Sequence, residues 1–256
     1  MHSLGHTRSS QKTNHALLTP ETFVRITLPG MKNCMAIVHA ATAMNAGFTQ
    51  YTAEFEAGGE LSDTAAQRFV FVLEGAVRLE INDPQNSGDE TQQHELRSRG
   101  YAYLPEGSKH RVTALQPSRT VVIEKAHEVL ESSAPPRLIV SHEDHVASHP
   151  LGDDPDLQVK NLLPDEMSFD FAVNTMVFQP GAALGMVEMH VMEHGLLMLE
   201  GGGIYRLGDS WYPVTAGDFI WMAPWCPQWF GALGKVPAKY LIYKNWNRHP
   251  LTSAGK

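Results

Sequence analysis

Residues 68–81 read RFVFVLEGAVRLEI, two short apolar runs separated by Glu74-Gly75. Both runs are rich in valine, isoleucine and phenylalanine, and runs of this length and composition are typical of β-strands joined at a glycine turn. A similar stretch, LEGGGIYRL, occupies residues 199–207 and again places glycine after Leu-Glu. We therefore predict that one kind of strand-turn-strand unit occurs in both halves of the chain.

The rest of the chain has the same character. Sixteen prolines and twenty-one glycines separate short runs such as VRITLPG, TVVIEKA, TMVFQPG and KYLIYKNW. This spacing is typical of many short strands joined by turns, as in a sandwich or a barrel. The best helical candidate is LPDEM at residues 163–167, which has residues suited to a first turn. We predict an all-β protein with few, short helices.

A second pair of similar segments indicates a tandem arrangement. RGYAYLPEGSKH at residues 99–110 follows the first hairpin, and GDFIWMAPWCPQ at residues 217–228 follows the second. We therefore predict two similar β-units joined by a segment rich in Ser, Pro, His and Asp. The expected boundaries are residues 1–14 for a flexible N-terminus, 15–126 for the first unit, 127–158 for the connecting segment and 159–256 for the second unit.

Composition limits the kind of protein this is. Of its 256 residues 43% are hydrophobic and 19% charged, as in an ordinary folded protein. Cys34 and Cys226 do not form a CxxC pair, so neither a disulfide framework nor a structural zinc site is expected. A net charge of −8 without a basic patch argues against nucleic acid as a partner. Because no apolar run approaches the roughly 18 residues of a membrane span, we expect a cytoplasmic protein without a membrane partner.

The stretch GMVEMHVMEHG at residues 185–195 gathers side chains that bind metals. On a strand, Glu188 and His190 would project from one face, while the residues between them pack on the other. His194 follows closely, and one residue from a distant strand would complete a site. A carboxylate with two imidazoles suits divalent manganese, iron, nickel or zinc. We predict a metal site here.

Two other interpretations of this stretch stay open. Residues 190–194 also match HxxEH, the inverted zinc-peptidase motif, in which both histidines lie on one face of a helix. Nearby glycines leave little room for such a helix, and Glu188 would point away from His190. Alternatively, the histidines are ordinary surface or core residues. The strand interpretation is favoured because it uses all three side chains.

Around this stretch the sequence resembles the cupin superfamily. The first cupin motif, G(x)5HxH(x)3-4E(x)6G, is similar to residues 181–201, with Glu, His and His at its ligand positions. The second is similar to residues 217–228, with Trp225 replacing a glycine and Gln228 replacing the last histidine. The resemblance implies two tandem cupin barrels, which are double-stranded β-helices of the jelly-roll type. The metal ligands that it implies are Glu188, His190, His194 and Gln228.

The first unit has lost most of this pattern. Ser62, Thr64 and Arg68 stand where the second unit has its glutamate and two histidines, although PEGSKH retains the second motif up to His110. A single histidine does not hold a catalytic ion. We expect the first unit to be metal-free and the second to be the active one.

Three longer stretches narrow the resemblance from the cupin superfamily to one family within it. Residues 15–34, 179–224 and 239–248 are similar to the (S)-ureidoglycine aminohydrolase family, bicupins of purine and allantoin breakdown. The resemblance implies Mn²⁺ as the cofactor and the hydrolysis of (S)-ureidoglycine to (S)-ureidoglycolate and ammonia. Members of the family also contact their substrate through a tyrosine and a lysine near the C-terminus, which match Tyr240 and Lys244.

These two residues extend the candidate site to the last strand. Tyr240 and Lys244 are four residues apart, so their side chains point the same way on a strand. The compact charge of Lys244 suits a substrate carboxylate. Glu188 is expected to be a metal ligand, a substrate contact and a proton carrier, with Gln228 as a ligand and a substrate contact. Glu188 and Lys244 are therefore the candidate catalytic residues.

Other functions are compatible with a cupin. Iron-dependent dioxygenases and metal-dependent isomerases share the superfamily, although a glutamine as fourth ligand argues against most of them. A bicupin that binds a small molecule without catalysis is a further alternative, and it would be supported if Lys244 and the four ligands failed to converge. Because exposed edge strands need covering and cupin units commonly pair through them, we expect a homo-oligomer.

Overall fold

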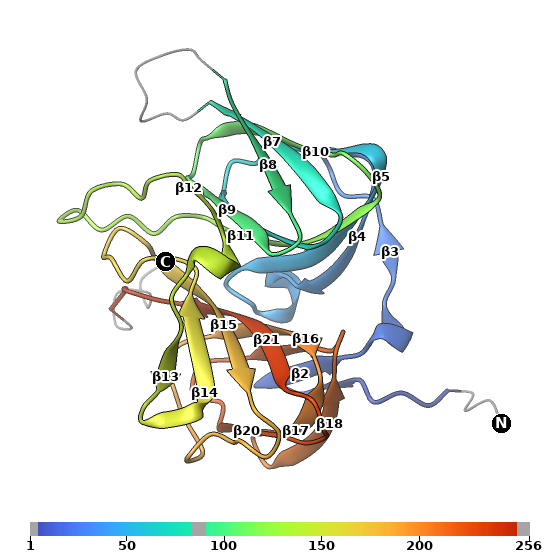
Figure 1. The fold of residues 1–256 in the computed structure, drawn as a ribbon, viewed down its shortest axis with the longest axis vertical. Coiled ribbons are helices and arrows are strands. Elements are labelled where there is room, and N and C mark those ends of the chain that lie inside the picture. The colour runs from blue at the N-terminus through green and yellow to red at the C-terminus, as the bar shows by residue number, and fades with distance from the viewer. Residues whose placement is uncertain (1–4, 83–90, 250–256) are drawn as a thin grey trace. The chain divides into compact units, whose positions relative to one another are not determined.

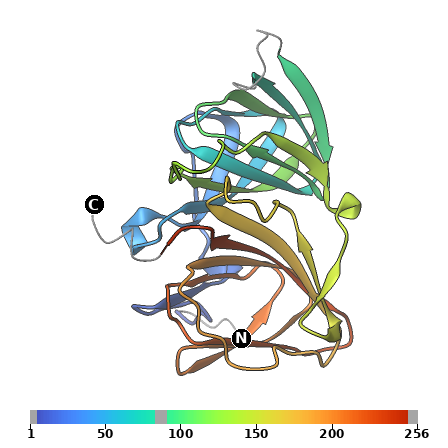
Figure 2. The ribbon, with the colours of Figure 1, turned by 90° about the vertical axis from the view of Figure 1, so that its left-hand side faces the viewer.

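β-Strands are the main secondary structure of the described residues, which confirms the all-β prediction. The computed structural model describes residues 5–82 and 91–249, and within them it has 21 strands and three single-turn helices. Two compact units are formed, which we call unit N (Val24–Val146) and unit C (Met1–Phe23 with Ala147–Lys256). Each unit is a barrel-like roll of antiparallel strands (Figures 1 and 2).

Unit N contains one continuous sheet with two additional strands. The sheet order is β12-β9-β6-β11-β5-β10-β7-β8, and β4 pairs with both β3 and β5. In β10 every second side chain is buried, which is the alternation expected of a strand with one face on the core. The strands are β3 (Arg25–Ile26), β4 (Met31–Ala40), β5 (Thr49–Ser62), β6 (Gln67–Glu74), β7 (Ala76–Asn82), β8 (Gln92–Arg97), β9 (Gly100–Leu104), β10 (Lys109–Ala114), β11 (Ser118–Lys125) and β12 (Ile139–His142), with single-turn helices at Thr42–Met44 and Glu143–His145.

Unit C contains two sheets among its described residues. The larger has the order β1-β2-β19-β16-β21-β15-β14-β13, and the smaller has the order β18-β17-β20. A single-turn helix lies at Pro20–Thr22. The strands are β1 (Ser10–Gln11), β2 (His15–Leu18), β13 (His149–Leu151), β14 (Asp154–Asn161), β15 (Phe171–Phe178), β16 (His194–Glu200), β17 (Gly202–Leu207), β18 (Ser210–Thr215), β19 (Phe219–Met222), β20 (Gln228–Ala232) and β21 (Ala238–Asn245).

The repeated hairpin predicted from Leu-Glu-Gly is present in both units. Gly75 joins β6 to β7 and Gly201 joins β16 to β17, and both have a positive φ, 83° and 63°. A Cβ atom at Gly201 would meet the carbonyl oxygen of Pro237, so glycine is required there for space as well as for conformation. The two hairpins are thus equivalent positions in two similar units.

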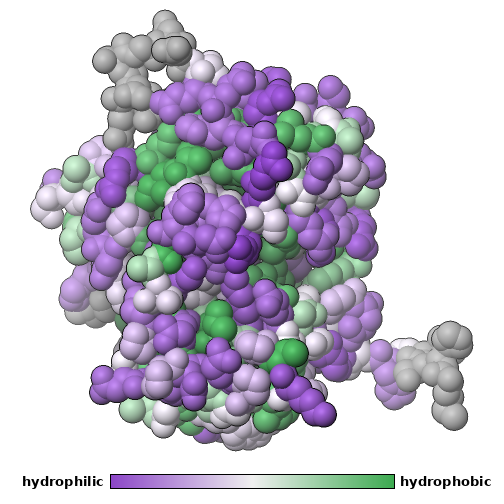
Figure 3. Space-filling view, in the orientation of Figure 1, coloured by the Kyte–Doolittle hydropathy of each residue, from purple (hydrophilic) through white to green (hydrophobic). Residues whose placement is uncertain are grey.

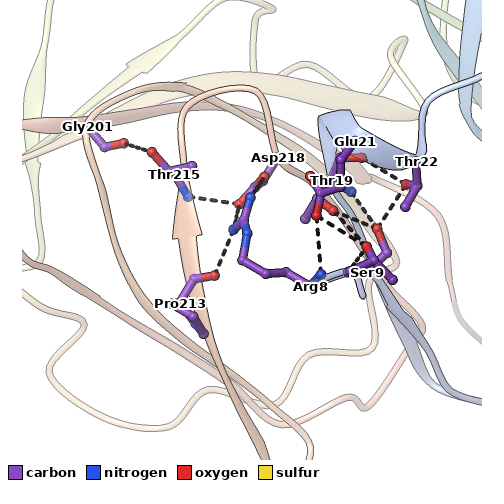
Figure 4. A network of polar contacts seen from close by, with 10 residues as sticks. Arg8, Ser9, Thr19, Glu21, Thr22, Gly201, Pro213, Thr215 and Asp218 are labelled. Carbon is purple, nitrogen blue, oxygen red and sulfur yellow. Dashed lines mark hydrogen bonds and ion pairs between the residues drawn. The ribbon is translucent and has the colours of Figure 1, made fainter. Parts of the chain in front are cut away.

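The unit boundaries differ from those expected, because the N-terminal residues belong to unit C. Strand β2 pairs with β19, so that Leu17 lies opposite Ile220. The Arg8 guanidinium donates two hydrogen bonds to the buried Asp218 carboxylate, at 2.6 and 2.8 Å (Figure 4). The segment expected to be flexible is therefore attached from Arg8 onward. Residues 1–4 and 250–256 of the expected boundaries lie outside the described residues.

The expected connecting segment is also divided between the two units. Its first part stays with unit N because β12 pairs with β9, and its second part forms β13 and β14 of unit C. The helix predicted at residues 163–167 is wrong, because this segment is a turn closed by a hydrogen bond from Phe169 N–H to the Glu166 carbonyl. Five residues are too few to form a stable helix without tertiary support.

Each unit has its own apolar core. In unit C the core includes an aromatic cluster in which the rings of Phe178 and Phe230 are 4.9 Å apart, edge to face, and Tyr205 and Tyr240 pack against them. In unit N the core is aliphatic for the most part, with Val72, Leu79 and Val122 among its members. The face in Figure 3 is mostly hydrophilic, with hydrophobic residues in separate groups. No helix in the described residues has the length and apolarity that crossing a membrane would require.

Candidate metal and substrate site

The predicted ligands come from one loop and two strands of unit C. Glu188 and His190 lie in the irregular segment before β16, while His194 begins β16 and Gln228 begins β20. The loop is tied to β20 because the Glu188 and Gln228 backbones exchange two hydrogen bonds, of 2.8 and 2.9 Å. This pairing fixes Glu188 beside Gln228 although they are far apart in sequence.

The local conformation differs from both interpretations of this segment. The strand expected through Glu188 and His190 is reduced to a single bridge, and the helix that HxxEH would require is absent from these described residues. Gly181 has a positive φ of 90°, which interrupts regular pairing after β15. The convergence predicted for the two side chains is nevertheless present, since His190 Nε2 donates to Glu188 Oε2 at 3.0 Å.

His194 is held in the form that binds metals. The ring is buried and stacks on His190 with centroids 5.4 Å apart. Nδ1 donates to the Met192 carbonyl at 3.0 Å, so the lone pair belongs to Nε2. Burial, followed by the positive charges of Lys244 and His190, lowers the pKa of His194 to about 3. The ring is therefore neutral near pH 7.

Gln228 is positioned by a residue that the sequence did not single out. The hydroxyl of buried Tyr205 donates to Gln228 Oε1 at 3.2 Å. Burial, together with the Glu188 carboxylate, raises the pKa of Tyr205, which keeps the phenol protonated as a donor. The sequence GGGIYRL could have indicated this position of Tyr205, because Gly203, Tyr205 and Leu207 are every second residue of β17 and point to the buried face.

Trp225 fills the place of a motif glycine while retaining the glycine-like backbone. Its φ is 64°, in the left-handed region, and its N–H donates to the His190 carbonyl at 2.6 Å. The side chain is 61% exposed, so its size is accommodated outside the core. This hydrogen bond anchors the loop that carries His190.

Lys244 lies directly opposite His194, so the two side chains share one face of the sheet. Burial lowers the pKa of Lys244, and the carboxylates of Glu188 and Asp165 oppose this effect. The amine Nζ is 5.7 Å from the ring centre of Trp246. Lys244 therefore places its amine beside His194, one of the four predicted ligands.

Tyr240 lies deeper than the other predicted residues. It is 2% exposed, and its ring centroid is 5.5 Å from that of Phe178. Burial raises its pKa well above the usual value, and the neighbouring Tyr205 and the Glu188 carboxylate act in the same direction. Tyr240 is thus a protonated phenol whose ring packs against the aromatic core.

The four predicted ligands suit a divalent ion in their chemistry rather than in their spacing. Within residues 5–82 and 91–249, no group of three or more His, Cys, Asp or Glu side chains has the spacing of a preformed metal centre. The four predicted ligands still fit in chemistry, because they offer two imidazole nitrogens and two side-chain oxygens. Glu188 and His190 now contact each other through the atoms that would bind an ion, and His194 Nε2 keeps its lone pair.

In unit N the position equivalent to His194 is occupied by Arg68, a permanent cation. Arg68 lies opposite Glu124 in the β6–β11 pair, as His194 lies opposite Lys244 in the β16–β21 pair. Its guanidinium donates to Glu124 Oε1 at 2.8 Å and to His110 Nε2 at 2.7 Å. A guanidinium is always charged and does not act as a metal ligand, so this arrangement differs chemically from that of unit C.

Comparison with known proteins agrees with the fold. The cupin domain family matches residues 174–243. An (S)-ureidoglycine aminohydrolase of Arabidopsis thaliana is 42% identical over 251 residues, which are 96% of this chain and 80% of that protein. The crystal structure of a putative glyoxylate-induced protein from Pseudomonas aeruginosa is similar with a TM-score of 0.84 and 29% identity, over 97% of this chain and 94% of that one.

A more distant neighbour shares the fold alone. Oxalate decarboxylase of Bacillus subtilis, whose Mn(II) centres have been studied, gives a TM-score of 0.64 at 11% identity, over 94% of this chain and 80% of that one. These similarities and the two barrel-like units confirm the prediction of tandem cupin barrels. With 42% identity over nearly its whole length, the chain belongs to the (S)-ureidoglycine aminohydrolase family.

Proposed function

We propose that this protein hydrolyses (S)-ureidoglycine to (S)-ureidoglycolate and ammonia, with a divalent metal, in purine and allantoin catabolism. The observation that carries the proposal is the convergence of Glu188, His190, His194 and Gln228 with Lys244 on β21. The names of relatives support the same activity. The convergence also argues against a binding protein with a vestigial site.

The ligands we propose for Mn²⁺ are Glu188, His190, His194 and Gln228. Their mixed nitrogen and oxygen donors suit this ion, and a protein of the same fold has Mn(II) centres. A bound ion would supply Lewis acidity and a fixed point for orienting the substrate. Tyr205 would keep the Gln228 amide in place, and the hydrogen bond of Nδ1 would keep Nε2 of His194 directed to the ion.

The protein's own groups would bind the substrate and move protons. Lys244 is the cation we assign to the substrate carboxylate, and Tyr240 and Gln228 are the hydrogen-bonding groups assigned beside it. Several fixed contacts on one carbon centre would select one enantiomer. Glu188 is assigned as the proton carrier between water and the leaving amine, because it is the carboxylate of the cluster.

The test is ammonia release from freshly made (S)-ureidoglycine by metal-stripped protein, before and after Mn²⁺ is added. We expect release that depends on Mn²⁺ and yields (S)-ureidoglycolate. His190→Gln should abolish this dependence, while His94→Gln, in unit N, serves as the matched control. If ammonia does not exceed the spontaneous rate while Mn²⁺ is bound, the activity is wrong, and other small amino or hydroxy acids become the candidates.

Glu188→Gln separates the proton carrier from the ligand. We expect turnover to fall by about 100-fold or more, a typical effect of losing a general acid or base, in protein that still binds Mn²⁺. Full turnover with bound metal would show that Glu188 does not carry the proton.

A further inference from the structure

The end of β21 is fastened to the turn that precedes β15. Trp246 N–H donates to the Asp170 carbonyl at 3.0 Å, and Asn247 Nδ2 donates to the Glu166 carbonyl at 2.8 Å. Arg248 Nη1 donates to the Met167 carbonyl at 3.0 Å. Three successive residues after β21 are therefore fixed against residues 166–170, immediately beyond Lys244.

Within this fastening, the Trp246 side chain is held by a charged group. Its indole N–H donates to Asp165 Oδ1 at 2.7 Å, a charge-assisted hydrogen bond. Trp246 is half-buried, while Asp165 is exposed. The carboxylate therefore restricts the rotation of the indole from the solvent side.

The oriented indole in turn faces the ammonium of Lys244. Nζ lies 5.7 Å from the ring centre, within the range of a cation–π contact. Among the described residues, no carboxylate forms an ion pair with Nζ. A lysine has a flexible four-carbon side chain, and an aromatic face restricts it without occupying its hydrogen-bond donors.

We propose that Trp246 and Asp165 are positioning residues, which hold the Lys244 ammonium where it receives the substrate carboxylate. This inference rests on the function proposed above for Lys244. An ion pair would fix the ammonium equally well but would compete with the substrate for it. The indole avoids this competition because it offers only its ring face.

Weaker positioning should act on substrate binding. Trp246 and Asp165 are not among the proposed ligands, so we expect Mn²⁺ binding to stay at the wild-type value when they are replaced. If the Lys244 side chain rotates freely, its ammonium should bind the substrate carboxylate more weakly in the orientation that leads to reaction. We therefore expect KM to rise about three- to ten-fold in Trp246→Leu, the range that a cation–π contact supports, with kcat nearly unchanged.

A matched control is available in the same unit. Trp211 on β18 is more exposed than Trp246 but likewise lies over a cation, with Arg206 Cζ 5.9 Å from its ring centre. Trp211→Leu removes a similar contact at a place without a role in the proposed site, so its KM should stay at the wild-type value. Asp165→Asn retains an oxygen acceptor for the indole but removes a negative charge near Lys244, so its KM should rise less than that of Asp165→Ala, which removes both.

A second readout does not require activity. In metal-free protein labelled with ¹³C at lysine Cε, the ring current of Trp246 should shift the Lys244 methylene protons upfield; Lys244→Arg assigns the signal. Trp246→Leu should move this signal to the position of the other lysines, and Trp246→Phe should retain part of the shift. An unshifted wild-type signal, or an unchanged KM in Trp246→Leu, overturns the positioning role. A shifted signal without ammonia release supports the positioning and rejects only the proposed reaction.

Discussion

Replacing Arg8 by methionine tests whether the N-terminal segment stabilises unit C. The Asp218 carboxylate is fully buried, and the Arg8 side chain beside it is 36% exposed. Removing one partner of a buried ion pair costs about 3–5 kcal/mol. The pair is open to solvent on one side and Asp218 keeps the Thr215 N–H at 2.9 Å, so we expect about 2–3 kcal/mol.

The assay can follow unit C separately. All five tryptophans, at positions 211, 221, 225, 229 and 246, lie in unit C, so tryptophan fluorescence during unfolding reports on that unit. A loss of 2–3 kcal/mol corresponds to a fall in Tm of about 5–10 °C for a unit of this size. In urea unfolding of the full chain, the midpoint of the fluorescence transition should lie at a lower urea concentration for Arg8→Met than for the wild type.

Arg97 provides the control because its ion pair with Glu95 is similarly short, 2.7 Å, but both side chains are exposed and lie in unit N. An exposed pair contributes less than about 0.5 kcal/mol, so Arg97→Met should leave the fluorescence transition of unit C at the wild-type position. If Arg8→Met costs no more than this control, the N-terminal segment does not stabilise unit C. In the double variant Arg8→Met with Asp218→Asn, the cost should be smaller than the sum of the single costs, because the buried charge is gone.

Three further predictions concern the site, the pH dependence and the hairpin turn. Tyr205→Phe removes the donor to Gln228 and should weaken Mn²⁺ binding about 10-fold or more, measured by titration of metal-stripped protein. In unit N, burial and the Arg68 charge lower the pKa of His110 to about 4. Between about pH 6.5 and pH 4, His110 is protonated in the unfolded state but neutral in the folded state. The free energy of unfolding of unit N is therefore unaffected by His110 above this range and falls within it, by about 2 kcal/mol at pH 5. His110→Gln should flatten this part of the dependence of the urea midpoint on pH. Gly201→Ala places a methyl group against the Pro237 carbonyl at a φ of 63°, and it should lower the free energy of unfolding by more than about 2 kcal/mol. Gly181→Ala, which has open space around it, should lower it by only about 1 kcal/mol. Thermal unfolding measures both.

Local patterns predicted the parts of the fold that depend on neighbouring residues. The hairpin at Gly75 and its counterpart at Gly201 were predicted because glycine, strand composition and recurrence all indicated the same turn. The pairing of β2 with β19 was not predicted, because HALL is a plain apolar run that does not specify its partner. The 210 residues between Arg8 and Asp218 likewise leave no local trace of their ion pair.

The site shows the same limit. Glu188 and His190 were predicted together because they are two residues apart, and their side chains meet even though the expected strand is a loop. Tyr205 was not singled out, since a buried tyrosine on a strand is common and its contact with Gln228 depends on β17 pairing with β20. The contact between Trp246 and Asp165 joins residues 81 apart, and Asp165 lies in the segment wrongly expected to be a helix.

The equivalent strand pairs of the two units carry different charged groups. In unit N the register places Arg68 opposite Glu124, so a fixed guanidinium satisfies the carboxylate and His110 within the protein. In unit C the same register places His194 opposite Lys244, so neither group neutralises the other. Burial of Lys244 disfavours its charged form, and nearby negative charges oppose this effect. The carboxylates of the proposed metal ligand Glu188 and of the proposed substrate would both supply negative charge beside the Lys244 amine.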